Sequence, residues 1–109
     1  MVERLDLTFA ALADPTRRAM LSNLAAGERS IGELAAPFAM SFAGAAKHVG
    51  VLERAGLVER RRAGRQQLCR IKADRLREAD AWLRQWERFW TSTLDRLEAV
   101  IAADQEKPI

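Results

Sequence analysis

The sequence predicts a mainly α, α+β domain of about five helices and one two-stranded β-hairpin. Three observations carry this prediction. Apolar residues recur at helical spacing behind N-terminal capping signals, one short basic stretch reads as a hairpin, and a long amphipathic segment follows it. A chain of 109 residues has room for one hydrophobic core, so we expect a single domain over residues 1–109.

The first three helices are predicted from their apolar spacing and their end signals. Apolar residues at helical intervals predict a helix over residues 2–12. Asp14 followed by Pro15 predicts the start of a second helix, because aspartate caps free amides and proline fits the first helical position. Ser30 and Glu33 have the spacing of a capping box, which predicts a short third helix.

The second half of the chain predicts one more short helix, the hairpin and a long helix. Ser41 can cap a fourth helix that ends before Gly56. Residues 57–62 and 66–71 flank a glycine-bearing loop, which is typical of a hairpin. Residues 74–103 then carry apolar side chains at steps of three, four or seven, and this spacing predicts a single amphipathic helix.

The order of these elements is more informative than any one of them. The third and fourth helices are separated by a tight turn at about residues 39–41, which is the arrangement of a helix-turn-helix. The hairpin follows directly, in the position of a wing. The predicted fold is therefore a winged helix-turn-helix.

The basic charge is concentrated in the middle of the chain. Eighteen basic and fifteen acidic residues give a net charge of +3, and by segment the charge is −1 for residues 1–40, +7 for residues 41–77 and −3 for residues 78–109. Such a concentration suits an anionic polymer as partner. Charge alone leaves a second interpretation open, a solvated surface laced with salt bridges.

Composition excludes several kinds of site and predicts a soluble, cytoplasmic protein. The single cysteine, Cys69, excludes an internal disulfide and an all-cysteine metal cage, and the single histidine, His48, excludes a site of several imidazoles. The apolar stretches are too short to span a bilayer, and the charged first residues do not form a signal-peptide core. We expect no metal and no other cofactor.

Several motifs resemble those of one family in order and spacing. They are residues 12–18 (LADPTRR), 32–35 (GELA), 38–41 (FAMS), 47–58 (KHVGVLERAGLV) and 62–66 (RAGRQ). Together they resemble the ArsR-type winged helix-turn-helix repressors, and the resemblance covers about residues 5–100. It implies a dimeric, DNA-binding transcriptional regulator, usually a repressor that often controls its own operon.

The resemblance also frames the metal question. Metal-sensing members of the family commonly carry a Cys-x-Cys pair on the third helix, where this chain has Ser30 and Gly32. Neither residue supplies a thiolate, and the last helix contains no histidine, whereas soft metals need such ligands. The chain is therefore more similar to the metal-free branch, with its final helix rich in tryptophan and phenylalanine.

The predicted DNA-binding residues lie on the fourth helix and the hairpin. On the fourth helix, the spacing predicts that Ala45, Val49 and Leu52 face the core. The outward positions, toward a major groove of double-stranded DNA, are then Phe42, Ala43, Ala46, Lys47 and Gly50. The predicted contacts are Ser41, Phe42, Ala43, Ala46, Lys47, His48, Arg61, Arg62 and Arg65.

The predicted contacts differ in what each can bind. Lys47 reaches phosphate or base, and Ser41 can bond a phosphate from the helix N-terminus. Phenylalanine and alanine at the start of this helix can touch thymine methyls but cannot discriminate a guanine edge. His48 enters through the family match, with a capping or packing role as the alternative. Arg65 sits at the hairpin tip, where an arginine can enter a minor groove or pair with phosphate.

The helices over 2–12 and 74–103 are predicted to form a homodimer interface. Their apolar stripes have no other obvious cover in one copy, and the stripe on the last helix suits core or dimer contact better than a ligand pocket. The predicted interface residues are Leu5, Phe9, Leu83, Trp86, Phe89, Trp90 and Leu97. A two-fold dimer implies a roughly palindromic operator.

Two other functions compete with this one. A winged-helix module for protein interaction, with weak or no reading of DNA, is the main alternative, because the outer face of the fourth helix is apolar. An enzyme is not expected, because Ser41 and His48 are the only suggestive pair and lie about two helical turns apart. Cys69 is interpreted as a small packed hydrophobe rather than a thiol sensor.

Overall fold

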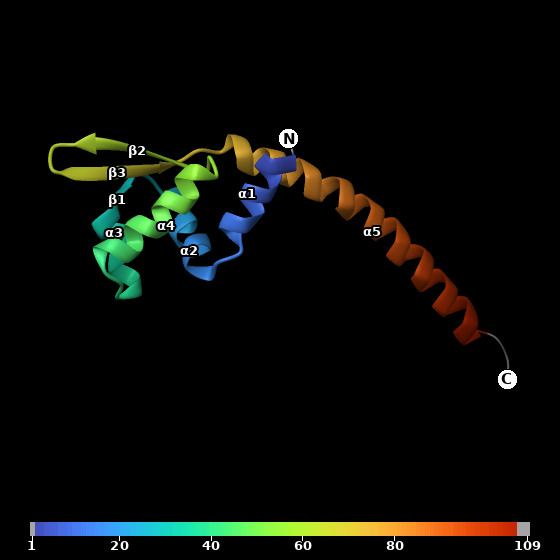
Figure 1. Cartoon of the computed structure of the whole chain (residues 1–109). Coiled ribbons are helices and arrows are strands. Elements are labelled where there is room, and N and C mark those ends of the chain that lie inside the picture. The colour runs from blue at the N-terminus through green and yellow to red at the C-terminus, as the bar shows by residue number, and fades with distance from the viewer. Residues whose placement is uncertain (1, 107–109) are drawn as a thin grey trace. The chain divides into compact units, whose positions relative to one another are not determined.

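The computed structural model describes residues 2–106 and divides into two compact units, Met1–Ala79 and Asp80–Ile109 (Figure 1). Its elements are α1 (Val2–Leu12), α2 (Pro15–Ala25), β1 (Arg29–Ser30), α3 (Ile31–Ala35), the 3-10 helix η1 (Ala36–Phe38), α4 (Phe42–Arg54), β2 (Val58–Ala63), β3 (Gln66–Ile71) and α5 (Asp74–Glu106). The predicted winged helix-turn-helix fold is confirmed. Among the described residues, no helix is long and apolar enough to cross a membrane.

The predicted helix caps form as the sequence indicates. The carboxylate of Asp14 accepts a hydrogen bond from the backbone N–H of Arg17 at 2.9 Å, with Pro15 as the first residue of α2. In the capping box of α3, the N–H of Glu33 donates to the Ser30 hydroxyl at 3.1 Å, and the N–H of Ser30 donates to the Glu33 carboxylate at 3.0 Å. These bonds satisfy amides that the first helical turn leaves free.

The sheet has three strands, where the sequence predicts two. β1 pairs antiparallel with β3, so the order is β1-β3-β2, with Ser30 opposite Leu68 and Arg29 opposite Cys69. A two-residue strand is too short to show any alternation of apolar and polar residues, which is why the sequence pattern does not predict it. The extra strand joins the start of α3 to the wing, which is the β2–β3 hairpin.

The core of the first unit lies among α2, α3, α4 and the sheet. Its largest fully buried side chains are Met20, Leu24, Leu34, Leu52, Leu57, Val49, Val58, Thr8 and Cys69. α1 buries Thr8 and Ala11 in this core, whereas Leu5 and Phe9 of the predicted stripe are half-buried. Thr8 can be buried because its hydroxyl donates to the carbonyl of Arg4 at 2.9 Å, so no polar group is left unsatisfied.

α5 begins in the first unit and continues through the second. Its start is held by Ala79, which is buried, and by an ion pair between Arg4 and Glu78. The helix extends to Glu106, three residues beyond the predicted end near residue 103. The second unit consists of this helix alone among the described residues, and its large apolar side chains are exposed within one copy of the chain.

We predict that replacing Asp14 by asparagine makes the stability of the protein less sensitive to acid. The N–H of Arg17 lowers the pKa of the Asp14 carboxyl, so the charged cap stabilises the fold above the ordinary aspartate pKa near 4. That contribution disappears as the pH falls through the lowered value. Urea unfolding of both proteins at pH 6 and pH 3 measures the effect.

The other carboxylates titrate alike in both proteins, so the difference between the two pH dependences isolates the cap. Asparagine still accepts the hydrogen bond but carries no charge to lose. An equal loss of unfolding free energy in both proteins would contradict the prediction.

Candidate nucleic-acid interface

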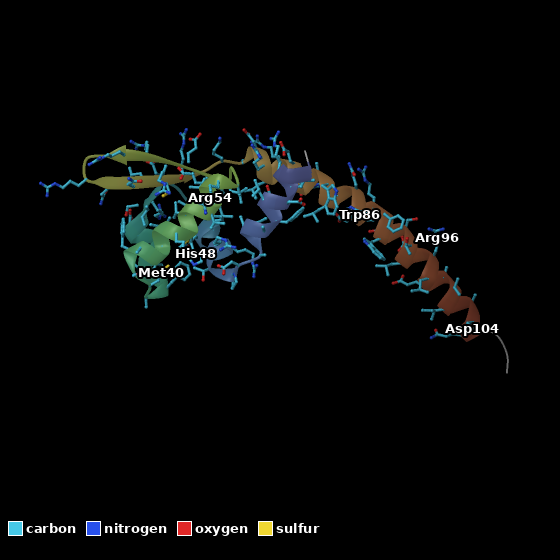
Figure 2. All side chains as sticks on the ribbon, in the orientation of Figure 1. Met40, His48, Arg54, Trp86, Arg96 and Asp104 are labelled. Atoms are coloured by element: carbon cyan, nitrogen blue, oxygen red, sulfur yellow. The ribbon has the colours of Figure 1, made fainter. Side chains whose placement is uncertain are left out.

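A left-handed residue makes the turn that positions α4. Ala39 has φ 52°, and it ends the 3-10 helix that follows α3. Ser41 is then extended, and its hydroxyl accepts a hydrogen bond from the N–H of Gly44 at 3.0 Å, so α4 begins at Phe42. This is the predicted helix-turn-helix, with α3 and α4 packed against each other. Figure 2 follows α4 from Met40, before its first turn, past His48 to Arg54 in its last turn.

The inner face of α4 is buried as predicted, and its N-terminal outer face is exposed. Ala45, Val49 and Leu52 have no exposed surface. On the other side, Phe42 is 62% exposed, and Ala43 and Lys47 are also exposed, whereas Ala46 is half-buried against the core. The outer surface of the first two turns is therefore apolar apart from the Ser41 hydroxyl and the Lys47 ammonium.

Gly50 does not face outward, and that prediction is wrong. The residue is buried, and a Cβ built on it would lie 3.4 Å from an Arg54 guanidinium nitrogen and 3.9 Å from one of Arg60. The long side chains of the two arginines therefore cover this turn of α4. Helical periodicity puts Gly50 away from the inward stripe, but it cannot show that the side chains of Arg54 and Arg60 cover the residue.

His48 is half-buried and contacts Arg17 of α2, a partner that sequence reasoning missed. The Arg17 guanidinium lies 3.4 Å from Nδ1 of His48 and donates to the carbonyls of Ala11 at 2.7 Å and Ala10 at 3.1 Å. Because arginine has only donors, this contact is a hydrogen bond in the tautomer whose Nδ1 carries no proton. Arg17 thus joins the end of α1 to the middle of α4. The sequence signal that could have pointed to Arg17 is the motif LADPTRR, residues 12–18, which contains it.

The register of the wing separates its arginines onto two faces. Arg60 lies opposite Cys69 on the face toward α4 and donates to the Glu53 carboxylate at 3.0 and 3.1 Å. Arg61 lies opposite Leu68 on the other face and forms a bidentate pair with Glu28 at 2.9 and 3.0 Å. This pairing raises the pKa of Arg61 and lowers the pKa of Glu28.

The tip of the wing presents Arg65 in a two-residue loop. Gly64 has φ 63°, a left-handed conformation, and the loop joins Ala63 and Gln66, which pair across the hairpin. Arg62 precedes the loop and donates to the Gly64 carbonyl at 3.3 Å. Both arginines are exposed, and the hairpin extends beyond the helices of its unit in Figure 1.

Ion pairs divide the basic residues of segment 41–77 into two groups of five. Those that pair with a carboxylate are Arg60, Arg61, Arg70, Lys72 and Arg77. Those with no carboxylate partner among residues 2–106 are Lys47, Arg54, Arg62, Arg65 and Arg75. Four of these five lie on α4 or at the tip of the wing. Within residues 41–77, the uncompensated charge therefore lies mostly on the two elements predicted to contact DNA.

Cys69 is a packed core residue. It has no exposed surface, and burial raises the pKa of its thiol, which keeps it in the unreactive neutral form. Arg70 is directed to the opposite face of the strand and pairs with Glu59 there, as the alternation of a strand requires. Within the described part of the chain, no group of three or more His, Cys, Asp or Glu side chains could hold a metal ion.

The apolar side of α5 carries a ladder of aromatic rings. Ring centroids are 5.7 Å apart for Trp82 and Trp86, 5.8 Å for Trp86 and Phe89, and 5.6 Å for Phe89 and Trp90. Trp86 is 44% exposed and Trp90 is 53% exposed within one copy. Leu83, Leu94 and Leu97 extend the same exposed stripe. Exposed apolar stripes of this length commonly mark interaction surfaces.

Comparison with known proteins agrees with this geometry. A family described as a helix-turn-helix domain matches residues 12–61, which run from the end of α1 into β2. The HTH-type transcriptional regulator Rv2034 of Mycobacterium tuberculosis is 37% identical over 89 residues, which cover 82% of this chain and 80% of that protein. The crystal structure of the ArsR family transcriptional regulator RHA00566 is 38% identical, with a TM-score of 0.78, over 84% of this chain and 95% of the other.

The chain belongs to the ArsR family of helix-turn-helix transcriptional regulators. Other solved structures resemble this ArsR-family chain at lower identity. An ArsR-like transcriptional regulator from Rhodococcus sp. RHA1 is 29% identical with a TM-score of 0.71, covering 91% of this chain and 93% of that one. A third structure is the winged helix-turn-helix DNA-binding domain of Mb0332 from Mycobacterium bovis, which is described as homodimeric. It is 29% identical with a TM-score of 0.66, covering 82% of this chain and 83% of that one.

Proposed function

We propose that this ArsR-family protein is a homodimeric, sequence-specific DNA-binding repressor that does not sense metal. In the proposed complex α4 enters the major groove and the tip of the wing contacts the sugar-phosphate backbone or the minor groove. The observation that carries the proposal is the uncompensated positive charge on α4 and at the wing tip. The proposed DNA contacts are Ser41, Phe42, Ala43, Ala46, Lys47, His48, Arg61, Arg62 and Arg65.

The unpaired basic side chains support DNA as the partner, because no carboxylate among the described residues neutralises their charge. Neutralising a phosphate releases condensed counterions, which supplies much of the free energy of DNA binding. Lys47 and Arg65 have no carboxylate partner to displace within the part of the chain that the structure describes, so their pairing with phosphate costs little. Arg61 contributes after its pair with Glu28 opens, so we rank it below Arg65.

The aromatic stripe of α5 supports a two-fold dimer. Large exposed apolar side chains along one helix would be costly in water, and a second copy of the same stripe buries them isologously. The proposed interface joins α1 and α5 of two copies through Leu5, Phe9, Leu83, Trp86, Phe89, Trp90 and Leu97. The domain of Mb0332, which is described as homodimeric, supports a homodimer.

A dimer of this kind sets the form of the operator and the mode of repression. Two recognition helices about 34 Å apart would meet successive major grooves on one side of the duplex, which requires a roughly palindromic site. Occupation of such a site within a promoter excludes the transcription machinery from it. The protein is therefore proposed to repress, with its own promoter as the first site to test.

The absence of thiolates supports the proposal that the protein does not sense metal. Ser30 and Gly32 occupy the positions of the Cys-x-Cys pair, Ser30 is committed to the capping box, and Cys69 is buried in the core. Soft metals need thiolate or several imidazole ligands. The family resemblance supplies these ligand positions, and the residues on them cannot bind such ions.

One observation favours a second function, a protein-interaction module with weak or no DNA binding. Phe42 is 62% exposed at the start of α4, and exposed aromatic side chains are common at protein interfaces. The cations of α4 and the wing tip that have no carboxylate partner among the described residues favour DNA instead. Binding measurements with DNA decide between the two.

We predict that replacing Lys47 or Arg65 by alanine weakens binding to a duplex from the protein's own promoter. Each loss should also flatten the dependence of log K on log salt concentration by about one unit per phosphate contact. Fluorescence anisotropy over a salt series measures both quantities, with an electrophoretic mobility shift as a second assay.

The matched control for this experiment is Arg77→Ala. Arg77 carries the same charge, but it is exposed on α5 and already pairs with Asp74 at 3.3 Å. Its removal should leave affinity and salt dependence nearly unchanged. Unchanged affinity of both the Lys47 and Arg65 variants at fixed salt would overturn the assignment of α4 and the wing tip as the DNA surface.

We predict that zinc, cadmium or trivalent arsenic at low micromolar concentration leaves the affinity for the operator unaltered. The reason is that the positions of the family's thiolates hold Ser30 and Gly32. Anisotropy titrations with and without each metal provide the check. Stoichiometric release of DNA by one of these metals would refute the prediction, and a Cys69→Ser variant would then show whether Cys69 is the ligand.

We predict that Trp90→Ala yields monomers or unfolded protein and reduces DNA affinity, although Trp90 is not a DNA contact. Truncating a large buried aromatic side chain costs on the order of 3–5 kcal/mol, and a two-fold dimer loses the contact twice. Sedimentation at micromolar concentration, together with DNA titration, measures the outcome.

The control for the dimer is Arg88→Ala on the same helix. Arg88 lies two residues from both Trp86 and Trp90, and therefore on the opposite side of α5. This variant should remain dimeric. A wild-type protein that sediments as a monomer and still binds a palindromic duplex would show that the dimer proposal is wrong.

A further inference from the structure

We infer that the first two turns of α4 read thymine by its C5-methyl group, with Phe42, Ala43 and Ala46 as the apolar contact surface. The operator half-site is then expected to carry A·T or T·A pairs where the N-terminus of α4 enters the major groove. The inference rests on the proposed DNA binding and names the base that this surface selects.

The exposure of Phe42 is the first observation. Its ring occupies the first position of α4 and is 62% exposed, so the side chain contributes little to the core. Ala46 lies one helical turn further along the same row, and Ala43 begins the neighbouring row. These three side chains form a continuous apolar surface at the end of the helix that enters the groove.

The hydrogen-bonding groups of these turns leave little other means of reading bases. Residues 42–46 contain no Arg, Asn, Gln, Asp or Glu, which are the side chains that recognise guanine, adenine or cytosine edges. The Ser41 hydroxyl already accepts the N–H of Gly44, and its remaining proton suits a phosphate. Lys47 supplies one point charge. Thymine is the base with a methyl group in the major groove, so it is the base that an apolar surface can select.

The charges around the apolar surface favour nucleic acid over a protein as its occupant. Ala43 and Lys47 share a row of α4, so the apolar surface borders a free ammonium. The row of side chains four residues apart that starts at Phe42 and continues through Ala46 ends at Arg54. The Arg54 guanidinium lies across Gly50 and has no carboxylate partner among the described residues. An apolar surface that borders one ammonium, on a helix that carries a second unpaired cation at its far end, suits methyl groups that lie between two phosphate backbones.

The test removes the methyl group without changing base pairing. A binding site is first selected from duplexes with a randomised central segment, and each thymidine of that site is then replaced singly by deoxyuridine. Burial of one methyl group is worth about fourfold in affinity. We expect a loss of about this size at one or two positions in each half-site of the wild-type complex, measured by fluorescence anisotropy at fixed salt.

The variants separate methyl reading from electrostatics. Phe42→Ala should reduce the discrimination between the thymidine and deoxyuridine duplexes at those positions, and Phe42→Leu should restore part of it. Lys47→Ala should bind both duplexes more weakly and keep the ratio between them. Thermal unfolding of each variant shows that a lost ratio does not come from a lost fold, and the exposed position of Phe42 predicts an unchanged midpoint.

The possible outcomes distinguish this inference from the proposed function. Wild-type protein that binds none of the selected duplexes refutes both. Tight binding with equal affinity for thymidine and deoxyuridine at every position overturns the methyl reading and leaves DNA binding intact. Discrimination that persists unchanged in Phe42→Ala overturns the role of Phe42. A selected site that places G·C pairs where α4 enters the groove overturns the inference as well.

Discussion

Burial of the inner face of α4 is the constraint on which the rest of the interface depends. Ala45, Val49 and Leu52 have no exposed surface, and they pack against neighbouring helices and β2. A helix anchored along one stripe cannot rotate about its axis without exposing that stripe to water. Its outer face, from Phe42 to Lys47, therefore has a defined direction before any DNA is present.

Ion pairing then determines which positive charges remain available. Three arginines of the wing strands have acidic partners: Arg60 pairs with Glu53 of α4, Arg61 with Glu28 in the loop before β1, and Arg70 with Glu59 of β2. Exposed pairs of this kind add little stability, but they remove charge from the surface. Of the five basic residues of segment 41–77 that remain unpaired among the described residues, four lie on α4 or at the wing tip, so most of the free charge of this segment is in two places.

Most of the fold could be predicted from the sequence because its signals are local. Asp14-Pro15, the Ser30–Glu33 capping box and the Ser41 cap each act within four residues, and all three occur as predicted. The inward stripe of α4 was also predictable, since it depends on helical periodicity alone. The ArsR-family resemblance added what the residues could not supply by themselves, a function for this arrangement.

The tertiary structure decided the features that depend on residues far apart in the chain. β1 needs β3 as its partner, Gly50 is covered by a wing arginine, and Arg61 meets Glu28 from 33 positions away. Such contacts leave no periodic signal in either segment. The sequence by itself therefore determined the helices, the wing and the family. Only the folded chain decided which arginines are free and which apolar side chains stay exposed, because neutralisation and burial depend on neighbours in space.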